Sequence, residues 1–136
     1  MIKRWLQYLG IALFINAIFF NPAFSQGKSQ ANDPAGILLN PVKVAPHTYF
    51  IKGLAELGSS KNQNFISNAG FVVTPKGVVV IDALGSPALA QKLIKEVKQV
   101  TSQKIVAVIV THYHADHVYG LQEFKKIGAT IYAQQE

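Results

Sequence analysis

The chain has 136 residues, 49% of them hydrophobic, and 13 Lys and Arg against 7 Asp and Glu give a net charge of +6 at pH 7. The lysines are scattered, without a run of like charge or interleaved aromatic residues, which argues against nucleic-acid binding. The chain has no cysteine, which excludes disulfides and thiolate metal ligands within these residues.

The first 25 residues have the three-part layout of a secretory signal peptide. A basic start with Lys3 and Arg4 leads into the apolar stretch Leu9–Phe20, and the small-residue pattern Ala23-Phe24-Ser25 follows. The apolar stretch is shorter than the roughly 20 residues that a membrane-spanning helix needs. We therefore expect cleavage after Ser25, a periplasmic or secreted location, and no membrane association of the mature chain.

The remaining residues are enough for one hydrophobic core and too few for two independent domains. Residues 26–43 begin with a stretch rich in Ser, Gln, Asn, Gly and Pro and are expected to form a mobile N-terminal segment. Residues 44–136 are expected to form the folded domain.

Strand patterns dominate the first part of this domain. Thr48–Lys52 and Asn64–Thr74 are predicted strands, joined by the polar, glycine-bearing connection Leu54–Asn64, which is expected to be flexible. Pro75-Lys76-Gly77 predicts a tight turn. The continuous apolar run Val78–Ile81 then fits a strand that is covered on both faces.

Helical patterns alternate with strands in the second part. Ser86-Pro87 predicts the start of a helix, with Ser as the N-cap, and apolar residues recur at helical spacing up to Val100. The apolar run Lys104–Val110 predicts a buried strand. A second helix is expected over Asp116–Ile127, ended by Gly128, and a last strand follows it. This order predicts an α/β fold.

The segment between the buried strand and the second helix is rich in metal-binding side chains. It reads His-Tyr-His-Ala-Asp-His and supplies His112, His114, Asp116 and His117. Alternate residues of an extended segment project from the same side, so His112 and His114 can face one cation. Imidazole and carboxylate are ligands that zinc accepts. The pattern predicts a metal site at the carboxyl end of a strand, where open α/β sheets bind ligands.

Two of these residue types also have ordinary structural uses. Asp116 stands where a helix begins and could act simply as an N-terminal cap. His47, in a proline-marked entry to a strand, has no acidic or imidazole neighbour in the sequence, and we expect it to be structural or solvent-facing.

The hexapeptide, together with Gly77–Asp82 before it and Gly128–Ala133 after it, resembles the metallo-β-lactamase superfamily of metallohydrolases. The resemblance runs from about Val44 to Glu136. It implies the N-terminal half of an αββα sandwich, in which one face of the sheet would be left uncovered.

The resemblance also implies roles for these residues. His112 and His114 would bind a first zinc ion, and Asp116 and His117 a second, with a shared hydroxide as the nucleophile. Asp116 would be catalytic as well, because it orients that hydroxide. Asp82 matches a family acid that is expected to brace the loop.

The implied activity is zinc-dependent hydrolysis of an amide, ester or thioester in a small-molecule substrate. Relatives supply further ligands from segments beyond position 136, so the chain alone is expected to be inactive. One alternative is a non-enzymatic metal-binding remnant or half-domain that needs a partner. Another is an iron-dependent oxidoreductase on the same fold, because His and Asp do not specify the metal.

Overall fold

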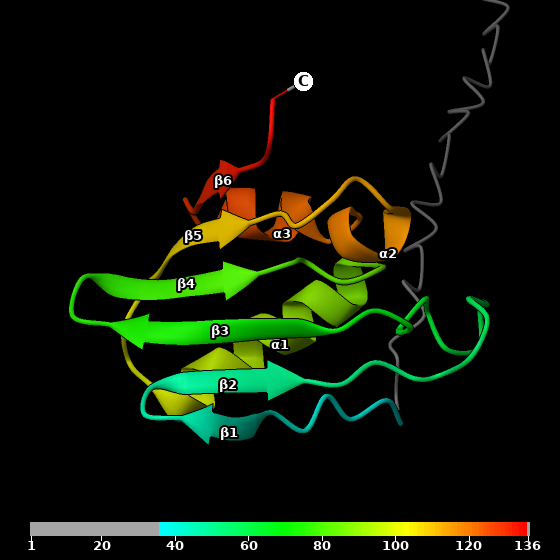
Figure 1. Ribbon diagram of the computed structural model, residues 1–136, viewed down its shortest axis with the longest axis horizontal. Helices are drawn as coiled ribbons and strands as arrows, with labels where there is room; N and C mark the ends of the chain where they lie inside the picture. The colour runs from blue at the N-terminus through cyan, green and yellow to red at the C-terminus, as the bar shows by residue number, and fades with distance from the viewer. Residues whose placement is uncertain (1–35, 136) are drawn as a thin grey trace, which may run out of the picture.

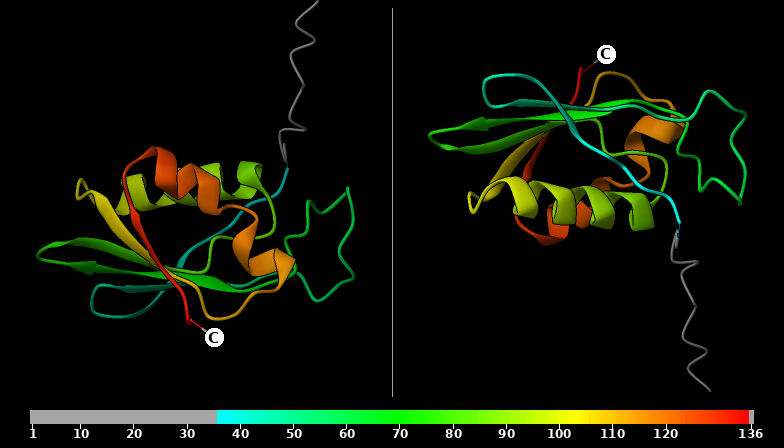
Figure 2. Two further views of the ribbon diagram at one scale, coloured as in Figure 1. Left: turned by 90° about the horizontal axis from the view of Figure 1, so that it is seen from above. Right: turned by 90° about the horizontal axis from the view of Figure 1, so that it is seen from below.

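The computed structural model describes residues 36–135, which form one six-stranded sheet with helices on one side (Figures 1 and 2). The predicted signal peptide and residues 26–35 of the predicted mobile segment lie outside the described residues. Within residues 36–135, no helix is long and apolar enough to cross a bilayer. The strands are β1 (Val42–Ala45), β2 (Thr48–Ile51), β3 (Ala69–Thr74), β4 (Gly77–Ile81), β5 (Ile105–Ile109) and β6 (Thr130–Tyr132).

The strands follow one another across the sheet in chain order, β1 to β6. The first four are antiparallel neighbours, whereas β4, β5 and β6 are parallel to one another. Parallel neighbours need a crossover connection, and helices supply it here. The carboxyl ends of β4 and β5 therefore lie side by side at the same end of the sheet.

The first crossover helix, α1 (Pro87–Val100), forms as the sequence predicts. The hydroxyl of Ser86 accepts a hydrogen bond from the amide of Leu89 at 3.2 Å, and Pro87 occupies the first turn. Leu89, Leu93 and Val97 are fully buried against the sheet. The apolar stripe, not the intrinsic preference of the chain, supplies most of the stability of such a helix.

The predicted single helix over Asp116–Ile127 is two helices, α2 (Ala115–Val118) and α3 (Leu121–Lys126). The break falls at Gly120, whose amide donates to the carbonyl of Leu84 at 3.2 Å and so leaves the helical ladder. A Cβ atom at Gly120 would overlap the carbonyl oxygen of Ala83. The close approach of these two backbones, which local sequence does not reveal, ends the first helix. Gly128, at φ +84°, ends the second as predicted.

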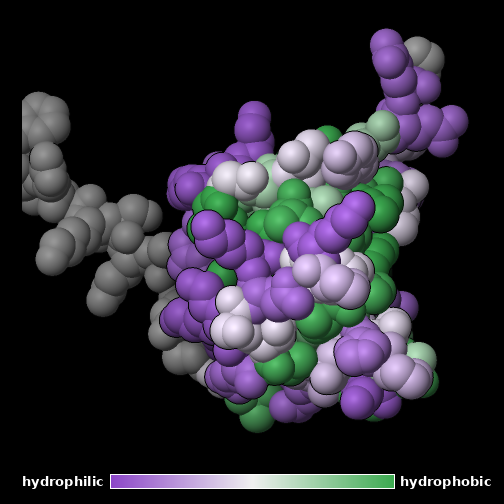
Figure 3. Space-filling model, turned by 90° about the vertical axis from the view of Figure 1, so that its left-hand side faces the viewer, coloured by the Kyte–Doolittle hydropathy of each residue, from purple (hydrophilic) through white to green (hydrophobic). Residues whose placement is uncertain are grey.

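The core lies between the sheet and the helices, and the other face of the sheet is open (Figure 2). Because the strands are in register, one row of residues crosses the open face from edge to edge. Four large side chains in this row are exposed: Val42, Phe50, Ile109 and Tyr132. This is the uncovered apolar face that half of a sandwich implies. On the side of the molecule that carries the β3–β4 turn, hydrophilic side chains surround smaller hydrophobic areas (Figure 3).

The packed part of the chain begins before the expected boundary at residue 44. Leu39 is 2% exposed and belongs to the core, and the ammonium of Lys92 on α1 donates to the carbonyl of Ile37 at 2.7 Å. Strand β1 begins at Val42. Residues 36–43, which were expected to belong to the mobile segment, thus contribute to the fold.

The predicted strand Asn64–Thr74 is shorter than expected, because β3 begins only at Ala69. The connection before it is bonded internally around Asn62, which is 5% exposed. Its side-chain oxygen accepts from the amides of Ser59 and Asn64 at 2.9 and 3.1 Å, and its amide group donates to the carbonyl of Leu57 at 2.9 Å.

Glu123 on α3 links the two crossover helices, and its carboxylate gives the fold a pH dependence. The hydrogen bond from Lys126, at 2.6 Å, is the main cause that lowers the pKa of Glu123, and a bond from Gln91 on α1, at 3.0 Å, adds to it. A carboxyl whose pKa is lower in the folded state stabilises the fold above its unfolded pKa of about 4.3. That contribution is lost as the pH falls through the lowered pKa.

We therefore expect the free energy of unfolding to fall less steeply on acidification in Glu123→Gln than in the unmodified protein. The effect should be modest, because Lys126 is largely exposed and solvent screens its charge. Thermal unfolding at about pH 6 and about pH 3.5, on either side of the ordinary carboxyl pKa, measures it. Glu96→Gln on α1 is the control. An equal acid-induced loss in Glu123→Gln and the unmodified protein would contradict the assignment.

Candidate metal centre

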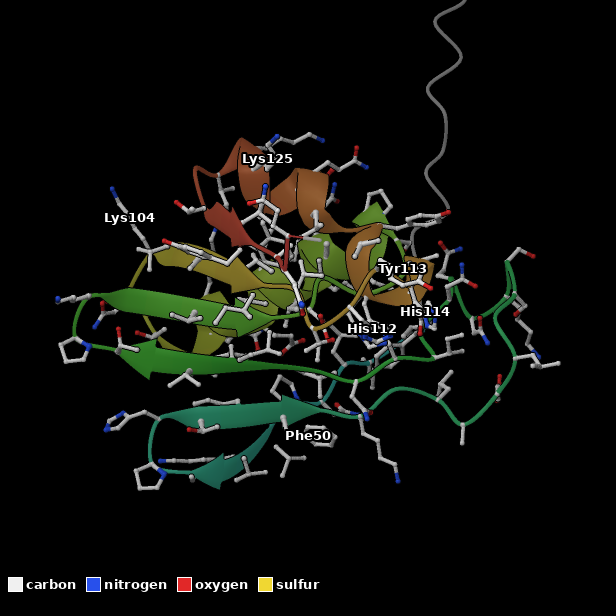
Figure 4. The ribbon with its side chains drawn as sticks, turned by 45° about the horizontal axis from the view of Figure 1, so that its top comes forward. Phe50, Lys104, His112, Tyr113, His114 and Lys125 are labelled. Atoms are coloured by element: carbon white, nitrogen blue, oxygen red, sulfur yellow. The ribbon has the colours of Figure 1, made fainter. Side chains whose placement is uncertain are left out.

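Val110 and Thr111 separate the end of β5 from the hexapeptide, whose last three residues form the start of α2 (Figure 4). The buried residues of β5, Ala107 and Val108 among them, hold the strand in the middle of the parallel part of the sheet. His112, Tyr113 and His114 therefore lie beyond the carboxyl end of β5, opposite the end of the strand that carries Lys104. His47 lies in the β1–β2 turn, at the end of the sheet opposite the carboxyl end of β5 (Figure 1).

The structure gathers the three predicted imidazoles. The ring centroids of His112 and His114 are 4.7 Å apart, and those of His112 and His117 are 4.0 Å apart. His112 and His114 are exposed, whereas the side chain of His117 is 16% exposed. His112 lies in the loop before α2, and His117 lies in α2 itself. The turn of the chain between them brings the two rings together.

Asp82, directly after β4, is the buried acid of this region and is 3% exposed. Its carboxylate accepts from the amide and the hydroxyl of Thr111, at 2.8 and 2.7 Å, and lies 2.8 Å from Nδ1 of His117. These contacts join the carboxyl ends of β4 and β5 to α2. Asp82 thus braces the loop, as the resemblance implied.

The contact between Asp82 and His117 also selects the tautomer of the imidazole. A carboxylate beside Nδ1 places the ring proton on that nitrogen and leaves the lone pair on Nε2. Metal-binding histidines typically donate their second nitrogen to a carboxylate in this way. Nε2 of His117 lies 3.5 Å from Oδ2 of Asp116. The pair therefore presents one nitrogen and one carboxylate oxygen side by side.

Asp116 lies in the first turn of α2, where its side chain is 25% exposed. The N-cap position belongs to His114, and its side chain makes no capping hydrogen bond. The plain alternative for Asp116, a cap that satisfies the start of the helix, is therefore not what the structure shows. The backbone carbonyl of Asp116 accepts a hydrogen bond from the hydroxyl of Ser67 at 2.5 Å. Ser67 was not predicted from the sequence.

The donor set fits zinc in its chemistry, with three imidazoles and one carboxylate. Among residues 36–135, however, no three His, Asp or Glu side chains are arranged so that they could hold one metal ion together. Nδ1 of His112 is instead 3.0 Å from the hydroxyl of Thr111. Because His112 and His114 are exposed, their rings can rotate toward a metal against little packing.

A cavity of about 400 Å³ adjoins the loop on the side of β6. His112 and Tyr113 form one wall, and the apolar side chains of Val118, Leu121 and Ile131 form much of the rest. Tyr113 itself is 81% exposed and lies edge-on to the ring of His114, with 5.1 Å between the centroids. An apolar space thus borders the imidazole cluster.

The family model described as the metallo-beta-lactamase superfamily matches residues 63–132, just over half of the chain and the part that contains the whole cluster. The chain belongs to the metallo-beta-lactamase superfamily. Similar members are a metallo-beta-lactamase type 2 of Elizabethkingia meningoseptica, 36% identical over 69 residues, and one of Bacillus cereus, 33% identical over 73 residues. These alignments cover 51% and 54% of this chain and 28% of each relative.

A further relative has a different name, and a solved structure is again a metallo-beta-lactamase. A linear primary-alkylsulfatase of a Pseudomonas strain is 29% identical over 70 residues, which are 47% of this chain and 13% of that protein. Among solved structures, a subclass B3 metallo-beta-lactamase from a soil metagenome library matches with a TM-score of 0.51 and 26% identity, over 67% of this chain and 31% of the other. This match, with the mixed sheet, confirms the predicted α/β fold, corresponding to half of a metallo-beta-lactamase domain. The alignments span less than a third of each relative.

Proposed function

We propose that the chain belongs to an exported, zinc-dependent hydrolase and supplies the first four ligands of its metal centre. His112 and His114 would hold one zinc ion, and Asp116 and His117 a second one. The observation that carries this proposal is the contact between Nδ1 of His117 and the buried carboxylate of Asp82, because it prepares Nε2 of the same ring for a metal. Export rests on the signal-peptide pattern of residues 1–25.

The residues of the chain have distinct tasks in this proposal. When bound, zinc supplies Lewis acidity and lowers the pKa of water toward neutrality. Asp82 holds His117 in the required tautomer and orientation. Asp116, next to Nε2 of His117, accepts a proton or a hydrogen bond from the attacking water and so orients it toward the substrate carbonyl. The further ligands that complete both sites come from other parts of the protein.

We propose an amide, ester or thioester carbonyl as the substrate group. Two similar relatives are named as β-lactamases, which favours a cyclic amide, and the apolar cavity beside His112 and Tyr113 suits a substrate with an apolar substituent. A third relative is named as an alkylsulfatase, a name that refers to a sulfate ester. An assay therefore has to cover more than one ester class.

The decisive experiment measures metal content and hydrolysis together. We expect the complete protein to bind zinc in preference to iron and to hydrolyse a chromogenic β-lactam, a thioester or a lactone. A chelator should abolish the turnover, and added zinc should restore it. Residues 26–136 alone should bind less than two equivalents of zinc, weakly, and should be inactive, because the donors described do not complete a site.

Two outcomes would point to the alternatives. Iron in the purified protein, with oxygen consumption instead of hydrolysis, would favour an oxidoreductase on the same fold. Zinc binding without turnover of any tested substrate would favour a metal-binding half-domain that needs a partner. The arrangement of the described donors, no three of which could hold one metal ion, is the observation that keeps this second alternative open.

A further inference from the structure

The end of α2 has a hydrogen-bonding requirement that the helix itself does not meet. The last carbonyl groups of any helix have no partner within it and need one elsewhere. In α2, which has four residues, the carbonyl of Ala115 bonds to the amide of Tyr119 at 3.1 Å. The next carbonyl, that of Asp116, would ordinarily accept from Gly120. That amide donates to Leu84 instead.

Ser67 meets this requirement from 49 positions earlier in the chain. Its hydroxyl donates to the carbonyl of Asp116 at 2.5 Å, and Ser67 is 4% exposed. A carbonyl that is shielded from water and loses its donor keeps the cost of its desolvation. The following carbonyl, that of His117, is held separately by the amide of Ala83 at 2.8 Å.

Backbone contacts with the residues that follow β2 hold Ser67 in place. A Cβ atom at Gly53 would overlap the carbonyl oxygen of Ser67, so the two backbones touch. The amide of Gly53 donates to the side chain of Asn68 at 3.1 Å, and the amide of Leu54 donates to the carbonyl of Phe65 at 2.8 Å. These contacts fix the backbone that carries the Ser67 hydroxyl.

We propose that Ser67 is a positioning residue for Asp116 and, through it, for the second of the two zinc ions. This inference rests on the proposed function. The carbonyl and the carboxylate of Asp116 share one Cα atom, so a bond that fixes the carbonyl also fixes the direction from which the carboxylate leaves the backbone. His112 and His114 precede α2 and have no contact of this kind with Ser67. Loss of the hydroxyl should therefore affect one metal site and spare the other.

The test compares Ser67→Ala with Ser67→Thr, which keeps a hydroxyl, and with Ser102→Ala, an exposed serine in the turn between α1 and β5. Zinc titration and the absorption spectrum of the cobalt-substituted complete protein report the two sites separately. We expect Ser67→Ala to weaken the binding of the second equivalent about tenfold, the usual effect of losing a supporting contact, and the first by less than twofold. Ser67→Thr should retain the second equivalent, and Ser102→Ala should match the unmodified protein.

Each result decides for or against the proposal. Equal weakening of both equivalents, a lowered melting temperature with unchanged metal binding, or failure of Ser67→Ala to fold would assign Ser67 a role in stability and overturn the positioning role. The proposed function fails separately, if the unmodified complete protein binds no zinc and has no chelator-sensitive turnover. Two equivalents bound equally by the unmodified protein and Ser67→Ala would overturn only the inference about Ser67.

Discussion

Asp116→Ala should lower the chelator-sensitive turnover of the complete protein by at least about two orders of magnitude, as expected when a group that binds the metal and orients the nucleophile is lost. The carboxylate lies beside Nε2 of His117, so its removal takes one of the two donors that the pair presents together. The measurement is kcat and KM for the best substrate at saturating zinc. Because the loss concerns the reacting geometry, it should fall mainly on kcat.

The control for this substitution is Glu96→Ala on α1, which removes an acid from the crossover helix and should leave kcat unchanged. Zinc content must be measured for both variants. Full activity of Asp116→Ala with normal zinc content would refute the role assigned to Asp116. A loss of activity that excess zinc restores would restrict that role to metal affinity.

The second large effect concerns the buried acid. Asp82→Asn should weaken zinc binding by about 10–100-fold, with little change in the melting temperature. Asn fits the space and tolerates the backbone at this position, where φ is +61°. It cannot, however, present two acceptor oxygens to Thr111 and His117 at once. An amide group turned toward Nδ1 of His117 would favour the other tautomer and place the proton on Nε2, where the metal should bind.

Thr111→Val is the matched comparison. It removes one hydrogen bond to Asp82 and the contact with Nδ1 of His112, and it leaves the contact between Asp82 and His117 in place. We expect its zinc affinity to change by less than about threefold, since the tautomer of His117 stays the same. The chemical shifts of the two ring nitrogens of His117, measured by NMR, report the tautomer directly. Equal affinities for Asp82→Asn and the unmodified protein would show that Asp82 does not prepare His117.

Much of the fold could be predicted from local patterns. The apolar runs of β4 and β5 and the capped, amphipathic α1 are specified by their own residues, and each formed within one or two positions of its predicted bounds. The division between α2 and α3 could not be predicted, because it depends on how closely Gly120 approaches Ala83 from another part of the chain. Strand β1 was missed for a similar reason, since its exposed residues gain their place by pairing with β2.

In the candidate site, too, local sequence indicated some residues and could not indicate others. His112, His114, Asp116 and His117 lie within six consecutive positions, so the sequence alone indicated a metal site. The bond from Ser67 joins residues 49 positions apart and involves a backbone carbonyl, which carries no residue type. No pattern of side chains could have revealed it. Asp82 was indicated only by the resemblance, and the structure shows the three contacts through which it acts.

The order of the strands has a consequence for how the domain folds. Because β1 to β6 are neighbours in the sheet in the order of the chain, each strand can pair with the one that was synthesised just before it. Pairing between consecutive strands closes shorter loops than pairing between distant strands would, which lowers the entropy cost of forming the sheet. The bond from Ser67 to Asp116 spans a much longer loop and should form among the last contacts. Asp116 would therefore reach its final position on a sheet that has already folded, and the second of the two proposed zinc sites would be completed late.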